Sequence, residues 1–174
     1  AFHVYGDAGG WDLTGLAGAG GLDAPGAHRR LDRSTGAWVL VSPTRNVRPS
    51  STTTGDDRPA CPLCPGGGEL GGGFALAVFD NRFPAVVPDA PAVPGDDRVA
   101  PSGGRCQVVV HTARHVERPA DLSAAELVAV TAVLRERTAE LWREGHTYVM
   151  AFENHGATVG ATLPHQHGQL YALD

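Results

Sequence analysis

Two histidines and a glutamine occupy alternate positions near the end of the chain, in LPHQHGQLYALD at residues 163–174. Residues two apart in a β-strand lie on the same face, so His165, His167 and Gln169 would point to one side. Two imidazoles and an amide are not typical core side chains. The alternation therefore predicts a functional face, and polar residues lining a sheet edge are the alternative.

A second candidate site lies in a long polar segment, residues 44–73, where Cys61 and Cys64 form a C-x-x-C motif. Two thiolates at this spacing can bind one zinc ion, which prefers four sulfur and nitrogen ligands. The alternatives are ordinary loop cysteines and a redox dithiol. A redox motif normally opens a helix after a strand, whereas this one lies among prolines and glycines. The third cysteine, Cys106, falls within an apolar run and is expected in the core.

Distant histidines could complete a zinc site. His115 follows a predicted strand and His165 begins the last one, so a Cys2His2 site would hold the long loop against two strand ends. On spacing alone, a surface histidine is the simpler interpretation of His115. If a metal holds His165, then His167 is directed into the same cavity. Its neutral imidazole could attack phosphorus, and the Gln169 amide could hold a phosphate oxygen as charge develops.

One clear helix is predicted over residues 121–145. Ser123 and Glu126 have the spacing of a capping box, and Gly145 suits the end of the helix. Its apolar stripe comprises Leu127, Val130, Leu134 and Leu141.

Runs of β-branched and aromatic residues between turn formers predict the strands. Strands on both sides of a single helix predict an α+β fold, with an antiparallel sheet and the helix on one face. Residues 1–27, rich in glycine and alanine, are expected to be a flexible segment before one domain at 28–174, and residues 90–104 a loop. The predicted strands are 36–43 (a buried strand), two short ones within 74–89, 105–112, 146–154 and a last one carrying the alternating motif.

Composition narrows the functional class. The 174 residues carry a formal charge of −5 with only 14 lysines and arginines and no basic run, so nucleic-acid binding is not expected. No apolar stretch reaches the roughly 20 residues that span a bilayer, and no secretory signal is seen. An odd number of cysteines argues against a disulfide scaffold and favours a reducing, cytoplasmic location.

Several segments in order resemble the galactose-1-phosphate uridylyltransferase family of the histidine triad superfamily. FENHGATVGATLPHQHGQLYA, residues 152–172, is similar to the family's F-E-N-x-G, a spacer and H-P-H-x-Q. Other similar segments are HRRLDRSTGAWVLVSPTRNVRP (28–49), CPLC (61–64), FDNRFPAVVPDAP (79–91) and RCQVVVHTARHVERPADLS (105–123). The resemblance implies a histidine-triad-like antiparallel sheet with one main helix, as one half of a two-repeat enzyme.

The resemblance also implies a role for each matching residue. His167 would be the nucleophile that takes a uridylyl group, and Gln169 would support the phosphoryl oxygens. The implied zinc ligands are Cys61, Cys64, His115 and His165. The implied substrate-binding residues are Arg45 and Arg48 at the nucleotide phosphates, Asn81 and Arg82 at the uridine, and Asn154, Gly160 and Thr162 around the phosphate pocket.

The implied reaction is ping-pong transfer of a uridylyl group between UDP-glucose and galactose 1-phosphate. Gln169 stands where hydrolase branches of the superfamily carry a third histidine, and an amide cannot act as a general acid. Two residues depart from the family pattern: Gln166 replaces the proline between the histidines, and Arg82 replaces an aspartate at the ribose contact.

The largest departure is length, since the family usually has two related halves. The resemblance therefore implies that a C-terminal half, on a separate chain or a missing segment, completes the enzyme, and that the assembly is a dimer. Two alternatives stay open. One is a nucleotide phosphorylase of the same superfamily acting on an ADP-sugar or dinucleoside polyphosphate, and the other is an incomplete, zinc-stabilised nucleotide-binding half.

Overall fold

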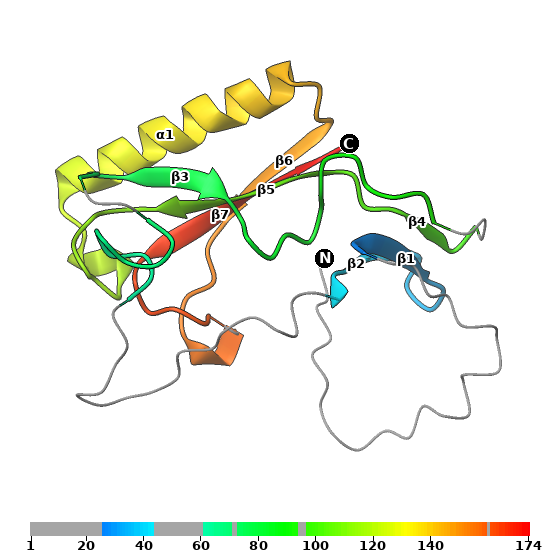
Figure 1. Cartoon of the computed structure of the whole chain (residues 1–174), viewed down its shortest axis with the longest axis horizontal. Coiled ribbons are helices and arrows are strands. Elements are labelled where there is room, and N and C mark those ends of the chain that lie inside the picture. The colour runs from blue at the N-terminus through cyan, green and yellow to red at the C-terminus, as the bar shows by residue number, and fades with distance from the viewer. Residues whose placement is uncertain (1–25, 44–60, 71–72, 94–96, 160) are drawn as a thin grey trace.

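The described residues form two antiparallel sheets and one long helix (Figure 1). This computed structural model describes residues 26–43, 61–70, 73–93, 97–159 and 161–174. The α+β prediction is confirmed, although two sheets form where one was expected. The larger sheet has the order β3-β5-β7-β6, from Ala77–Asp80, Gly104–Val110, His167–Leu173 and Tyr148–Phe152. The smaller has the order β2-β1-β4, from Ala37–Val41, His28–Asp32 and Val99–Pro101.

The pair β5 and β7 forms the centre of the larger sheet. Their antiparallel register places Val110 opposite His167 and Val108 opposite Gln169. Side chains alternate between the two faces, so Val109 and Leu170 pack in one buried cluster with Leu141 of the helix α1. Both faces of these strands are covered, since Cys106 is 3% exposed, as its expected core position requires.

The helix α1, Ala124–Arg143, begins with the predicted capping box. Ser123 accepts a hydrogen bond from the Glu126 amide, and the Glu126 side chain accepts one from the Ser123 amide. Val130 and Leu141 are buried, but Leu127 is 46% exposed and does not belong to the core. At about 100° per residue, Leu127 is rotated by about 60° from Val130, at the margin of the buried face.

Short-range sequence signals missed the smaller sheet. Strand β1 was not predicted, and β4 lies in a segment that was expected to be a loop. The second strand expected within residues 74–89 is reduced to a single bridge between Val87 and Gly103. Strand β2 was predicted as buried, but it is mostly half-buried and Trp38 is 40% exposed. Strand β1 pairs with β2 across the turn at residues 33–36 and with the distant β4. Its sequence, HRRLD, has one apolar and no β-branched residue, so local composition does not predict it, and β4 depends on a partner far away in the chain.

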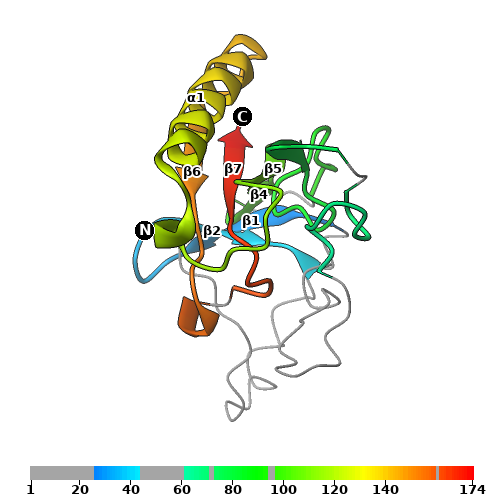
Figure 2. The same cartoon turned by 90° about the vertical axis from the view of Figure 1, so that its left-hand side faces the viewer.

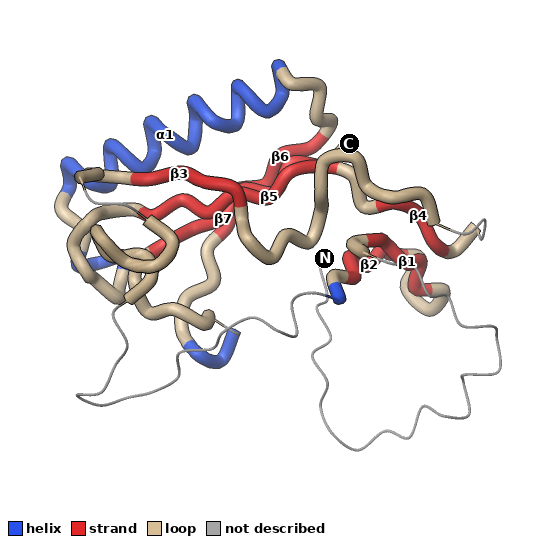
Figure 3. The backbone as a smooth tube through the Cα atoms, viewed as in Figure 1, coloured by secondary structure: helices blue, strands red, loops and turns tan. Residues whose placement is uncertain are grey.

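The helix and the smaller sheet lie on opposite sides of the larger sheet, and loops gather at one end of it. In Figure 2, α1 lies along one face of the larger sheet, and β1 and β2 lie on the opposite side. Figure 3 shows loop segments gathered at the end of the sheet where β7 begins. The 3-10 helices Pro119–Asp121 (η3) and Ala157–Val159 (η4) lie in the segments that lead from β5 to α1 and from β6 to β7. Within the described residues, no helix is both long enough and apolar enough to cross a membrane. The proposed N-terminal segment, residues 1–27, lies almost entirely outside the described residues.

Candidate functional site

Four metal-ligating side chains converge at the end of the sheet where β5 stops and β7 starts. The ligand atoms of Cys61, Cys64, His115 and His165 all lie within 4.8 Å of one another. Because β5 and β7 are antiparallel neighbours, the segment after β5 and the segment before β7 meet at this edge. The structure therefore brings together the four residues that the sequence singled out from distant positions.

The loop that carries the two cysteines is shaped by its own backbone. The Cys64 amide donates to the Cys61 carbonyl at 3.1 Å, and the Gly67 amide donates to the Cys64 carbonyl at 2.8 Å. A side chain at Gly67 would lie 2.4 Å from the Cys61 carbonyl oxygen, so only glycine fits. Leu63 is 2% exposed and packs with Val110 of β5, which anchors the loop to the sheet.

Hydrogen bonding orients the His165 imidazole toward the thiols. Its Nε2–H donates to the carbonyl oxygen of Thr112 at 2.9 Å, so the lone pair is on Nδ1. Nδ1 lies 3.6 Å from the Cys61 sulfur and 3.5 Å from the Cys64 sulfur, and the His115 Nδ1 lies 3.3 Å from the Cys64 sulfur. Such distances between ligand atoms suit four donors around one tetrahedral ion.

The electrostatics of the thiols also fit a metal. Burial, followed by the neighbouring Cys61, raises the pKa of the Cys64 thiol to about 11. At neutral pH the Cys64 thiol therefore keeps its proton until a cation displaces it. With all four positions taken by protein ligands, an ion here would have a closed coordination shell, as structural zinc sites do.

His167 is the first residue of β7 and is 8% exposed. Its Nδ1–H donates to the carbonyl oxygen of His165 at 2.7 Å, which places the ring's lone pair on Nε2. The same residue that offers Nδ1 to the thiols thus also sets the tautomer of the next histidine. An imidazole in this tautomer presents a nucleophilic nitrogen.

Gln169 lies on the same face of β7, two residues beyond His167, and is 3% exposed. Among the described residues its side-chain oxygen has no hydrogen-bond partner. A buried amide without a protein partner is uncommon and suits a group that binds a ligand or water. The three alternating residues of the motif are therefore all buried, and they share one face.

A histidine that was not predicted as a site residue, His111, lies against the opposite face of β7. His111 follows β5 and is 8% exposed, and its Nδ1 lies 4.0 Å from a carboxylate oxygen of Glu153. A side chain at Gly168 would approach the His111 Nε2 to 3.1 Å, so the glycine leaves room for the imidazole. The available signal was the strand period, which puts His111 on the same face as Val109.

The predicted substrate-binding residues are only partly described. Arg45, Arg48 and Gly160 lie outside the described residues. Asn154 and Thr162 are half-buried. Asn154 lies near β7, because it is two residues beyond Phe152, the partner of Gln169.

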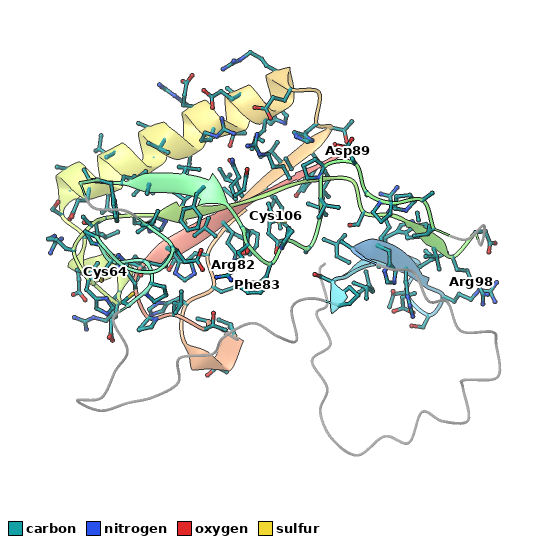
Figure 4. All side chains as sticks on the ribbon, viewed as in Figure 1. Cys64, Arg82, Phe83, Asp89, Arg98 and Cys106 are labelled. Atoms are coloured by element: carbon teal, nitrogen blue, oxygen red, sulfur yellow. The ribbon has the colours of Figure 1, made fainter. Side chains whose placement is uncertain are left out.

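Asn81 and Arg82 follow β3 on the side of the sheet away from α1, where Figure 4 shows Arg82 and Phe83. The Asn81 side-chain oxygen accepts from the Phe83 amide at 2.9 Å, which closes a turn. Arg82 lies 3.6 Å from Glu69 of the cysteine loop, with its side chain 71% exposed. Arg82 therefore borders the loop that carries the candidate metal ligands.

We predict that the purified chain binds about one zinc ion, because the four donors match a closed tetrahedral site. Cys64→Ser should lose most of the bound zinc and unfold at a lower temperature, measured by elemental analysis and thermal denaturation. Cys106→Ala is the matched control, since that buried cysteine is outside the cluster, and it should keep its zinc. Equal zinc contents in the two variants would contradict the assignment.

A pH dependence is predicted for His111. Burial lowers its pKa below the ordinary 6.5, while Glu153 opposes the shift. The unfolded chain then takes up a proton below about pH 6.5 that the folded chain resists, so stability falls as the pH drops. His111→Phe should reduce this fall by at most about 1.4 kcal/mol per pH unit, measured by urea unfolding between pH 7.5 and 5.5. The exposed His155→Phe should leave it unchanged, and identical pH profiles for all three proteins would contradict the prediction.

Comparison with known proteins places the chain in a family. The family model described as "Galactose-1-phosphate uridyl transferase, N-terminal domain" matches residues 22–174. The galactose-1-phosphate uridylyltransferase of Thermotoga maritima is 36% identical in an alignment of 152 residues that covers 83% of this chain and 46% of that protein. A probable galactose-1-phosphate uridylyltransferase of Drosophila melanogaster is 35% identical, again over 83% of this chain and 46% of its own length.

Solved structures agree. A uridylyltransferase structure superposes with a TM-score of 0.70 at 32% identity, covering 84% of this chain and 45% of that one. An ADP-glucose phosphorylase from Arabidopsis thaliana with bound ADP-glucose gives a TM-score of 0.53 at 23% identity, which shows a shared fold alone. The chain spans about half the length of the curated relatives it matches. It belongs to the galactose-1-phosphate uridylyltransferase family, in the part that corresponds to the N-terminal domain.

Proposed function

We propose that the protein transfers a uridylyl group between UDP-glucose and galactose 1-phosphate through a covalent uridylyl-His167 intermediate. The observation that carries this proposal is the 2.7 Å hydrogen bond from His167 Nδ1–H to the His165 carbonyl. It leaves Nε2 as the nucleophilic atom of a buried ring beside the metal-ligand cluster. Membership of the family supports the choice of substrates, since the relatives are named for this activity.

The reaction would proceed in two displacements at one phosphorus atom. His167 Nε2 attacks the α-phosphorus of UDP-glucose, and the bond to the glucose 1-phosphate oxygen breaks. The ring becomes cationic, and its Nδ1–H donates more strongly to the His165 carbonyl. Galactose 1-phosphate then attacks the same phosphorus, the bond to Nε2 breaks, and UDP-galactose leaves. Glucose 1-phosphate leaves as a stable phosphate anion and so needs no general acid, and galactose 1-phosphate attacks as an anion and so needs no general base, which fits an amide at Gln169.

Gln169 would stabilise the phosphoryl oxygens as charge builds on them. It lies on the face of β7 that carries His167, and its buried amide lacks a protein partner for its oxygen. Rotation of the amide presents its N–H₂ group to the same space. A donor held in place before the reaction stabilises the transition state without reorganisation.

Zinc is the metal that this donor set fits best. Cys61, Cys64, His115 and His165 would hold it, and an ion with four protein ligands supplies structural order instead of Lewis-acid chemistry. Its proposed contribution is to fix the loop and the start of β7. In that arrangement the chain's own hydrogen bonds direct His167 and Gln169 toward the substrate.

We further propose that a C-terminal half completes the sugar-phosphate site, in a dimeric assembly. The chain spans about half of its relatives, and β6 is an edge strand of the larger sheet. Near that edge, Tyr148 is 50% exposed, and α1 exposes further large apolar side chains. Exposed apolar surface beside an unpaired edge supports a partner there. The exposed residues on α1 are Leu127, Val128 and Trp142.

The covalent intermediate can be tested directly. On incubation with UDP-glucose, the chain should gain the mass of one uridylyl group, and His167→Gly should gain none. His146→Ala is the control, because this histidine precedes β6 at the end of the sheet away from His167, where it pairs with Asp174. An adduct of equal yield on His167→Gly would refute the nucleophile.

A donor and acceptor screen separates the candidate reactions. With UDP-glucose and galactose 1-phosphate, the chain alone should form the adduct once, and sustained release of UDP-galactose should require the second half. Arg82, in place of the family's aspartate, is the departure that leaves the phosphorylase alternative open, so ADP-glucose with inorganic phosphate is the comparison. An adduct from ADP-glucose alone would assign the phosphorylase reaction. Sustained turnover by the chain alone would contradict the need for a second half.

A further inference from the structure

The carboxylate of Glu126 makes more contacts than a helix cap requires. Glu126 is the third residue of α1, and its Oε2 accepts from the Ser123 amide and hydroxyl, each at 2.8 Å. These bonds complete the capping box through one oxygen. The other oxygen, Oε1, accepts from the Thr112 hydroxyl at 2.6 Å and from Arg114 Nε at 3.0 Å. The carboxylate therefore joins the helix start to the segment that follows β5.

Thr112 links this carboxylate to the metal cluster. It is 3% exposed, and its hydroxyl donates to Glu126 while accepting from the Arg114 amide at 3.2 Å. Its backbone carbonyl accepts from His165 Nε2–H at 2.9 Å. The side chain of Thr112 is thus held by the helix, and its carbonyl orients a metal ligand.

The ion pair around Glu126 keeps it charged. Arg114 donates to both of its oxygens, with Nη2 2.6 Å from Oε2, and also donates to the Asp121 carbonyl at 3.2 Å. These bonds, led by the one from Arg114, hold the pKa of Glu126 well below its usual range. Because Arg114 and Ser123 both bind the Glu126 carboxylate, its position is restricted, and it can hold the Thr112 hydroxyl in one place.

We propose that Glu126 is a positioning residue of the metal centre, which holds Thr112 so that its carbonyl fixes His165 with Nδ1 toward the thiols. This inference rests on the proposed metal site, because the group that it positions is one of the four ligands. Hydrogen-bond partners of metal-bound histidines fix the tautomer and ring orientation, and their loss weakens metal binding. Glu126 does not contact His165 itself but acts through Thr112. Since Glu126 also caps α1, folding of the start of the helix and formation of the metal cluster would depend on each other.

A pair of variants separates this role from capping. Glu126→Ala removes the cap and the Thr112 contact, whereas Ser123→Ala removes the cap side chain and leaves Thr112 bound to Glu126. Zinc affinity, measured by competition with a chromophoric chelator, should weaken about tenfold in Glu126→Ala and less than about twofold in Ser123→Ala. The thiolate-to-cobalt charge-transfer band of the Co²⁺-loaded chain should shift in Glu126→Ala only. Equal affinities and equal spectra in the two variants would overturn the proposal.

A double-mutant cycle tests the route through Thr112. Thr112→Val keeps the backbone carbonyl and loses only the hydroxyl, so it should weaken zinc binding by a similar factor. If Glu126 acts through Thr112, the double variant should be no weaker than either single variant. Losses that multiply would show a separate route and overturn the proposal. Zinc binding is measured without nucleotide, so failure of the His167 adduct would leave this result standing, whereas a parent chain that binds no zinc would refute the metal site itself.

Discussion

His165 makes three interactions on which the geometry of the candidate site depends. Its Nε2–H is held by the Thr112 carbonyl, its Nδ1 faces the thiols of Cys61 and Cys64, and its own carbonyl accepts from His167. The first contact determines the second, because an imidazole that donates through Nε2 carries its lone pair on Nδ1, which then faces the thiols. A small rotation of His165 would therefore displace both a metal ligand and the proposed nucleophile.

The two faces of β7 differ, because one carries the polar residues of the candidate site and the other packs in the core. His167 and Gln169 lie on the face with the cysteine loop, while Leu170 packs in the cluster with α1. Gly168 lies between His167 and Gln169 in the sequence and faces the helix side. Because it has no side chain, the His111 imidazole can lie against the strand there. A strand that is buried on both sides cannot shift its register without moving every one of these groups. The core packing that stabilises the sheet thus also sets the position of the face that carries His167 and Gln169.

The proposed site has an inner part formed by this chain and an outer part that the proposed C-terminal half would supply. The four candidate metal ligands, the proposed nucleophile His167 and the carbonyl that sets its tautomer all come from described residues. The edge of β6 and the exposed residues Trp142 and Tyr148 have no covering element among the described residues. The proposed covalent half-reaction at His167 would need only the inner part, whereas recognition of a sugar phosphate would need surface beyond it. This division is why adduct formation and turnover are expected to separate.

The sequence by itself determined the local features. These are the helix with its capping box and the alternating face at the C-terminus, since spacing and residue type encode them. For the four candidate metal ligands, spacing alone left a surface histidine as the simpler interpretation of His115. The resemblance to a family supplied their grouping. Tertiary structure alone decided the smaller sheet, the exposure of Leu127, the place of His111 and the link from Glu126 to Thr112. Strand pairing and side-chain contacts across about 10 to 70 residues depend on which segments become neighbours, and no local periodicity records that.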